Sequence, residues 1–206
     1  MRNIVPLLLV LLAACCISKP VALSGVEVRD YRGERLSSVQ DFRENSIKGP
    51  QDVDIQNYSL KISGLVENPR ELAYGEVLAH RKYEKVVTLF CVEGWNAKIL
   101  WEGFLLTDLF GETLPGANTV IFRSVDGYST SLPLDYVRDR QIMLAYRMNN
   151  VTLPPERGFP FQVVAEDRWG YKWAKWVNEI EISDDAGFKG YWESRGYDAG
   201  GNLSAT

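Results

Sequence analysis

The chain has 206 residues, of which 46% are hydrophobic and 24% charged, and its formal net charge at pH 7 is −4. This composition is that of an ordinary globular protein, and the length suits one domain with a sizeable core. The acidic balance argues against a nucleic-acid-binding face, which needs clustered basic residues. The single histidine, His80, argues against His-rich metal sites, His-ligated haem and Ser–His–Asp catalysis.

Residues 1–20 have the pattern of an export signal: a basic residue, an apolar run over 7–14 and small residues before Cys15. The apolar run is shorter than the roughly 20 residues of a membrane span. Leu12–Cys15 resembles a lipoprotein signal box, in which the cysteine is acylated after cleavage. An ordinary signal peptide or a short anchor helix is the alternative. We therefore predict an exported, extracytoplasmic protein, lipid-anchored to the membrane, with residues 21–40 as a polar tether.

The rest of the chain, residues 41–200, is predicted to form one α+β domain of mixed β-sheets with short helices. Alternating or continuous apolar residues predict six strands, and shorter apolar patterns predict three helical segments. The run that ends at Cys91 is almost continuously apolar, so we expect both of its faces to be buried. In chain order, strands are expected at 54–64, 85–91, 119–124, 141–148, 159–166 and 175–182, and helices at 72–81, 105–110 and 134–137.

Cys91 is the most informative residue of the domain. The other two cysteines, Cys15 and Cys16, belong to the predicted signal region. An exported protein with one cysteine in its folded body has no disulfide framework, so we do not expect Cys91 to form a crosslink. Taken alone, Cys91 is either a buried packing residue or a ligand.

Aromatic residues alternate with lysines between positions 169 and 176. Trp169, Tyr171, Trp173 and Trp176 surround Lys172 and Lys175 in the sequence. Such a cluster suits a flat, anionic, ring-bearing ligand. Packing in the core is the simpler explanation for most of the aromatic side chains.

Four segments, read together, resemble the sulfite oxidase-fold family of molybdopterin-binding oxidoreductases. They follow the order of that family and extend the resemblance over about residues 40–197. The segments are Thr88–Trp95 with Trp101–Gly103, Leu144–Asn150 with Leu153–Pro154 and Gly158–Pro160, Gly170–Trp176, and Gly190–Tyr197.

The resemblance implies a molybdenum–molybdopterin cofactor (Mo-MPT) whose metal is ligated by Cys91. A soft thiolate suits such a metal site, and the cofactor carries the two-electron oxygen-atom transfer while the protein orients it. No haem is expected in this chain, nor the C-terminal dimerisation domain of true sulfite oxidases. The size and the export signal resemble the catalytic subunit of periplasmic protein methionine sulfoxide reductase, whose relatives draw electrons from a separate membrane partner.

The resemblance also assigns roles to individual residues. Tyr146 lies where sulfite oxidases have an active-site tyrosine, which places it beside Cys91 as a catalytic residue. The turn that holds the pterin and its phosphate corresponds to Trp173, Ala174 and Lys175, with Lys175 as the charge partner. The remaining cofactor contacts are Ser124 and, on a loop that faces cofactor and substrate, Arg43 and Asn45.

Two positions depart from the family pattern. Arg157 stands where many relatives have His or Asn, and Gln162 stands where they usually have Arg. Both positions contact the pterin or an anion in the family, so the departures change how the cofactor phosphate and the charge of the substrate are bound. Arg157 would return the positive charge that Gln162 lacks.

The leading interpretation is an enzyme that reduces a sulfoxide or N-oxide, small or protein-bound, or oxidises sulfite. It would exchange electrons with a separate partner and bind no nucleic acid. Two alternatives remain: a non-catalytic ligand-binding lipoprotein that retains the fold, and a structural surface lipoprotein with a buried free cysteine. The joint presence of Cys91, Tyr146 and Lys175 favours the enzyme.

Overall fold

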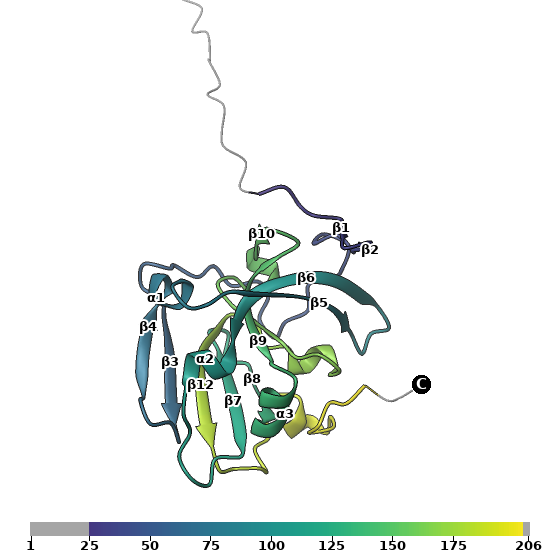
Figure 1. Ribbon diagram of the computed structural model, residues 1–206. Coiled ribbons are helices and arrows are strands. Elements are labelled where there is room, and N and C mark those ends of the chain that lie inside the picture. Colours follow the sequence, from purple (N-terminus) through teal and green to yellow (C-terminus); the bar gives the residue numbers. More distant parts are fainter. Residues whose placement is uncertain (1–24, 204–206) are drawn as a thin grey trace, which may run out of the picture.

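Two β-sheets pack against each other in the computed structural model, which describes residues 25–203. Figure 1 shows strands β5 and β6 curving across the top of the molecule, above the sheet that contains β3, β4, β7 and β12. The sulfite oxidase-type α+β architecture expected from the sequence is confirmed. The predicted signal and anchor over residues 1–20 lie outside the described residues.

The first sheet has the strand order β10-β9-β6-β5, and β11 also pairs with β9. All of its pairs are antiparallel. Because β5 pairs with β6 alone in this sheet, it is an edge strand, and its last residue leads directly into Cys91. The strands are β5 (Tyr83–Phe90), β6 (Asn96–Leu105), β9 (Met143–Met148), β10 (Val151–Thr152) and β11 (Gln162–Val164).

The second sheet has the order β4-β3-β12-β7-β8. Its β3–β12 pair is parallel and joins residues 118 positions apart, such as Lys61 and Glu179, whereas the other pairs are antiparallel. A separate hairpin of β1 (Asp30–Tyr31) and β2 (Glu34–Arg35) precedes both sheets. The strands of the second sheet are β3 (Ser59–Gly64), β4 (Arg70–Ala73), β7 (Thr119–Ser124), β8 (Ser129–Pro133) and β12 (Val177–Ser183).

The helices are short. The predicted segments at 105–110 and 134–137 are confirmed as α2 (Leu106–Phe110) and α3 (Leu134–Asp139). The helix expected at 72–81 is shorter, α1 (Tyr74–Leu78), because residues 70–73 pair with β3 as β4. Three single 3₁₀ turns follow, at Pro155–Arg157, Gly170–Lys172 and Glu193–Arg195. No helix within residues 25–203 is long and apolar enough to cross a membrane.

Large side chains from both sheets form one core. Trp101 and Phe104 of β6, Phe122 of β7 and Ile180 of β12 are all fully buried and belong to one contact cluster. Burying side chains of this size contributes about 1.5–3 kcal/mol each, so the two sheets stabilise one another. The ends of the sheets are thereby fixed relative to each other, and this is where the cavity described below opens.

The strand expected at 54–64 begins only at Ser59, and β8 was not predicted. Three further expectations are wrong in detail. β6 was not predicted, because its Gly103 was interpreted as a turn before a helix, whereas the strand continues through an irregularity between Glu102 and Gly103. The strand that ends before Cys91 is buried on one face only: Val87 and Leu89 point inward, whereas Phe90 is 36% exposed, as expected for an edge strand.

The third wrong expectation is that residues 21–40 form a tether separate from the domain. The described part of residues 21–40 packs on the domain: Leu36 is only 2% exposed, and the Val28 and Ser37 amides donate to the Asn149 and Lys98 carbonyls. The segment therefore belongs to the folded unit, because its apolar residues find a surface that the sequence pattern does not reveal.

Candidate active site

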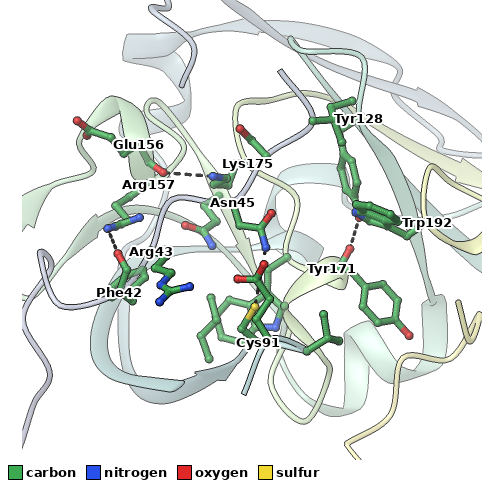
Figure 2. Close-up of a pocket in the computed structure, with 18 of the residues that line it drawn as sticks. Phe42, Arg43, Asn45, Cys91, Tyr128, Glu156, Arg157, Tyr171, Lys175 and Trp192 are labelled. Carbon is green, nitrogen blue, oxygen red and sulfur yellow. Dashed lines mark hydrogen bonds between the residues drawn. The ribbon is translucent and has the colours of Figure 1, made fainter. Parts of the chain in front are cut away.

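A cavity with about 1060 Å³ of space, part of it open to solvent, lies where the two sheets and the C-terminal segment meet. Figure 2 shows Cys91 between two groups of side chains, with Phe42, Arg43 and Arg157 on one side and Tyr128, Tyr171 and Trp192 on the other. Segments far apart in the chain line this space, namely residues 42–47, 89–95, 126–128, 156–162, 170–176 and 192–197.

Cys91 is placed in the cavity by a tight turn at the end of β5. The Cys91 amide donates to the Trp95 carbonyl at 2.9 Å, and the Gly94 amide donates to the Cys91 carbonyl at 3.0 Å. Gly94 has a φ of 88°, which side-chain-bearing residues rarely adopt. Cys91 is a free cysteine, 6% exposed, and it lines the cavity. The turn thus presents a single thiol to the enclosed space.

The pKa of the Cys91 thiol is raised, chiefly by burial and also by the charge of Glu93. A backbone hydrogen bond from Glu93 and the side-chain amide of Asn45 act in the opposite direction and offset part of this rise. The Asn45 Nδ2 atom lies 3.9 Å from the Cys91 sulfur (Figure 2). The predicted loop of Arg43 and Asn45 therefore does reach the cavity. Arg43 is exposed and forms no ion pair with any described residue.

Arg157 fastens this loop to the domain. Its Nε atom donates to the Val39 carbonyl at 3.2 Å, its terminal nitrogen donates to the Phe42 carbonyl, and its guanidinium lies 4.0 Å from the centre of the Phe42 ring. Arg157 lines the cavity as predicted. Burial lowers the pKa of its guanidinium, opposed by the charges of Glu156 and Glu44. Because protein carbonyls already occupy two of its donors, Arg157 positions the loop in this structure.

Lys175 is a largely enclosed cation that lines the cavity, with its side chain 14% exposed. Its Nζ atom lies 2.7 Å from a Glu44 carboxylate oxygen and donates to the Glu156 carbonyl at 3.2 Å. Burial lowers the pKa of this ammonium, while the hydrogen bond and charge of Glu44 raise it. A Cβ atom on Gly158 would stand 2.9 Å from the Lys175 Cβ, so the glycine makes room for this side chain. Lys175 is therefore held in place, with a carboxylate as its present partner.

Two of the remaining predicted cofactor contacts line the cavity and two do not. Trp173 and Gln162 line it, and Gln162, 3% exposed, forms no side-chain hydrogen bond with the described residues. Ala174 is buried outside the lining, and its carbonyl accepts the Val163 amide at 2.9 Å. Ser124 is also outside the lining, and its buried Oγ atom has no partner within the described residues.

Tyr146 is not brought to Cys91. Its hydroxyl donates to the Glu102 carboxylate, and its ring stacks on Phe104 with the ring centres 5.3 Å apart. Burial, followed by the hydrogen bond and charge of Glu102, raises its pKa. The residue does not line the cavity. The expected catalytic role of Tyr146 thus lacks geometric support, because its strand, β9, directs the hydroxyl to β6.

The C-terminal segment closes one side of the cavity through a buried ion pair. Lys172 and Glu193 lie 2.6 Å apart with both side chains almost fully buried, and Thr130 also donates to Glu193. This pair holds the segment that carries Trp192 and Tyr197, two lining residues. The two lysines of the predicted lysine–aromatic cluster therefore have different roles. Lys175 lines the cavity, whereas Lys172 holds the C-terminal segment that forms one of its walls.

Asp126 is a lining residue to which the sequence assigned no chemical role. Its segment was predicted only as a turn, and in the structure the residue is 2% exposed and lines the cavity. The turn signal of Asp126–Gly127 is correct, but only the folded structure shows that the turn faces the cavity.

The lining fits a planar organic group that carries a soft metal. A thiol, aromatic rings and the Ser46 hydroxyl, which has no hydrogen-bond partner among residues 25–203, line the same cavity. Within residues 25–203, no group of three or more His, Cys, Asp or Glu side chains is arranged to hold a metal ion, so Cys91 would bind a metal together with ligands from another molecule. The charges of the ionisable lining residues balance, with three cations (Arg43, Arg157, Lys175) and three carboxylates (Glu93, Asp126, Glu156).

The sequence profile described as "Oxidoreductase molybdopterin binding domain" matches residues 47–192, which is well over half of the chain. The chain belongs to this family. Its fold, with a cavity that presents one thiol, is thus the molybdopterin-binding domain of a molybdenum-dependent oxidoreductase. The family assignment implies the molybdenum cofactor.

Individual relatives agree with this family. The chain is 32% identical over 151 residues to "Uncharacterized oxidoreductase YuiH" of Bacillus subtilis, covering 72% of this chain and 76% of that protein. It is 31% identical over 150 residues to "Putative protein-methionine-sulfoxide reductase subunit YedZ1" of Azospira oryzae, covering 71% and 56%. It is 29% identical over 166 residues to a sulfite oxidase of Arabidopsis thaliana, covering 62% and 42%.

A solved structure shares the fold. The sulfane dehydrogenase SoxCD from Paracoccus pantotrophus superposes with a TM-score of 0.63 at 23% identity, covering 69% of this chain and 41% of that chain. At this identity the match shows the fold alone. The chain also spans only about half of YedZ1, so the activities named for these proteins are not carried over as findings.

Proposed function

We propose that this protein is an exported molybdenum oxidoreductase in which Cys91 ligates the metal of a molybdopterin bound in the cavity. The observation that supports this most directly is the buried, free thiol that a glycine turn presents to a cavity lined by aromatic and charged side chains. When bound, the cofactor supplies a molybdenum centre that exchanges an oxygen atom and two electrons with the substrate. A metal also keeps the thiol deprotonated, so no separate base is needed at Cys91.

The other lining residues bind and orient the cofactor in this proposal. Lys175 forms an ion pair with the cofactor phosphate, which replaces the Glu44 carboxylate as its partner. Trp173 supplies an aromatic wall, and Gln162 supplies a side-chain amide that has no partner among the described residues. Arg157 acts indirectly, because it holds the loop that carries Arg43 and Asn45 over the cavity.

The substrate we propose is a neutral sulfoxide or N-oxide. The balanced charges of the lining, with Lys175 paired to Glu44, leave Arg43 as the one lining cation without a carboxylate or carbonyl partner among the described residues. A site for the sulfite anion would favour a surplus of positive charge. Reduction consumes two electrons and two protons and releases the sulfide or amine together with water. The name of the YedZ1 relative, a putative protein-methionine-sulfoxide reductase subunit, supports this direction.

Sulfite oxidation is the second candidate, and the name of the Arabidopsis relative supports it. Both reactions require a separate electron-transfer partner, because the proposed site has one metal and no second redox group. We further propose that the protein acts outside the cytoplasm, tethered by a lipid on Cys15. Mass spectrometry of the mature N-terminus tests the tether: an unmodified residue beyond Cys15 would contradict it.

Turnover with matched substrates tests the function. The protein is purified from a host that makes molybdopterin, and reduction of an aryl methyl sulfoxide and of trimethylamine N-oxide by a reduced viologen dye is compared with oxidation of sulfite by ferricyanide. We expect turnover of an oxide and loss of that turnover in Cys91→Ser. Faster sulfite oxidation would favour the second candidate. A wild-type protein that contains neither molybdenum nor pterin would support the non-catalytic alternative.

A further inference from the structure

Apolar side chains gather beside the thiol where the cavity opens to solvent. Val92 follows Cys91 in the turn that the Gly94 amide closes on the Cys91 carbonyl, lines the cavity and is 46% exposed. A single exposed apolar side chain is common on a protein surface and needs no explanation. Val92, however, lines the cavity together with apolar side chains of its own turn and of the loop over residues 42–47, namely Trp95, Phe42 and Ile47. We call these four side chains the apolar subsite.

Two contacts bring the loop and the turn together at Cys91. The Asn45 side-chain amide of the loop lies 3.9 Å from the Cys91 sulfur (Figure 2). The Phe42 ring of the loop stacks on the Trp95 ring of the turn, with the ring centres 5.6 Å apart and the planes inclined at 29°. The apolar subsite therefore lies in the same part of the cavity as the thiol.

The rings of the apolar subsite are held in place before any ligand binds. The Trp95 indole N–H donates to the Glu93 carboxylate at 3.3 Å, and the Arg157 guanidinium lies 4.0 Å from the centre of the Phe42 ring. Rings that are already ordered lose little conformational freedom on binding. Glu93 and Arg43 line the cavity nearby with opposite charges, so the surroundings favour no ionic group over a neutral one.

We propose that the apolar subsite binds the organic substituent of the oxide substrate and makes Val92 a specificity-determining residue for sulfoxides or N-oxides with an aryl or branched alkyl group. An oxide that reacts at a metal held by Cys91 must bring its sulfur or nitrogen close to this thiol, so its substituent lies within a few bonds of the same place. Covering exposed apolar surface with an apolar group is favourable, and the gain grows with the area covered. The inference rests on the proposed function, because it requires an oxide substrate at Cys91.

The ratio of two turnover efficiencies tests the proposal. The quantity kcat/KM is measured with methyl phenyl sulfoxide and with dimethyl sulfoxide in the wild type, in Val92→Asn and in Ile55→Asn, with a reduced viologen dye as electron donor. Ile55 is a matched control: it is 40% exposed, lies outside the cavity lining and follows the first residue of a turn that the Asn57 amide closes on the Asp54 carbonyl. Both substrates are measured on one preparation of each protein, so differences in cofactor content cancel in the ratio.

We expect the wild type to prefer methyl phenyl sulfoxide by about tenfold or more, Val92→Asn to reduce this preference about fivefold, and Ile55→Asn to leave it unchanged. An unchanged ratio in Val92→Asn overturns the subsite and leaves the proposed function intact. A fall of both efficiencies by the same factor also overturns it, because Val92 would then act on a step common to all substrates, such as docking of the electron donor. A wild type that reduces no oxide overturns the proposed oxide reduction together with the subsite.

Calorimetry on the unaltered chain gives a readout that depends on neither turnover nor a variant. The cofactor-loaded wild type is titrated with each of the two sulfoxides in the absence of an electron donor. We expect the phenyl compound to bind about tenfold or more tightly and with the more negative heat-capacity change, because it buries more apolar surface. Equal affinities, or tighter binding of dimethyl sulfoxide, would overturn the proposal.

Discussion

The side-chain amide of Asn45 lies 3.9 Å from the sulfur of Cys91, although 46 positions separate the two residues in the chain. The loop that carries Asn45 is brought to this place by Arg157 and by the ion pair of Glu44 with Lys175. A donor beside the sulfur stabilises the thiolate and fixes its direction. The environment of the proposed ligand is therefore assembled from a segment outside its own strand and turn.

Asn45→Leu should weaken metal binding without unfolding the protein. Removing an outer hydrogen-bond partner of a metal ligand lowers metal affinity by about 10- to 100-fold. The measurement is molybdenum per chain after dialysis against a chelator, with the exposed Asn57→Leu as control. Undiminished retention in Asn45→Leu would show that the amide does not support the ligand.

Arg157→Met should release the loop over the cavity. The change removes two hydrogen bonds to the carbonyls of Val39 and Phe42 and the contact with the Phe42 ring, at a cost of about 3 kcal/mol. Urea unfolding measures the loss, and limited proteolysis should find new cleavage within residues 37–47. Arg157→Lys keeps the charge but lacks the planar fork, so we expect it to restore little of the protection. Unaltered cleavage in both variants would contradict the anchoring role.

Lys172→Met should destabilise the fold by about 3–5 kcal/mol, because it leaves the Glu193 carboxylate buried without its partner. The double variant Lys172→Met/Glu193→Leu removes both charges and should recover most of that loss. Chemical denaturation of the single and double variants gives the coupling energy. A double variant as unstable as Lys172→Met would show that packing, and not the uncompensated charge, dominates.

Glu179 should contribute stability at neutral pH that disappears in acid. Its partial burial raises the pKa, but hydrogen bonds from Lys61 and Ser63, with the charges of Lys61 and Arg123, together lower it below the ordinary value. A carboxyl with a depressed native pKa stabilises the fold above its unfolded pKa of about 4.3 and loses that contribution as the pH falls through the native value. The difference in unfolding free energy between wild type and Glu179→Gln should therefore be largest near pH 7 and shrink below about pH 4. A difference independent of pH would contradict this assignment.

Local sequence patterns predicted those features that depend on local residues. The strand before Cys91, its glycine turn and the α+β class follow from neighbouring residues, and they are found in the structure. The pairing of β6 with β9 and the packing of Leu36 depend on distant partners, so a pattern in one segment did not reveal them.

The candidate site shows the same contrast between features set by neighbouring residues and features set by distant partners. Seven predicted residues line the cavity, namely Arg43, Asn45, Cys91, Arg157, Gln162, Trp173 and Lys175. Tyr146 does not, because the direction of its hydroxyl is set by pairing with the strand of Glu102. Asp126 was missed for a different reason: its residue type is ordinary for a turn, and only the folded structure shows that it is buried against the cavity.

Sulfur coordination at molybdenum tests the central claim most directly. X-ray absorption at the molybdenum edge is recorded for the cofactor-loaded wild type and for cofactor-loaded Cys91→Ser, with pterin content measured in the same samples. Our account predicts that the variant loses one sulfur from the metal's coordination shell while the pterin stays bound. An unchanged sulfur shell in the variant would contradict the assignment of Cys91 as the ligand.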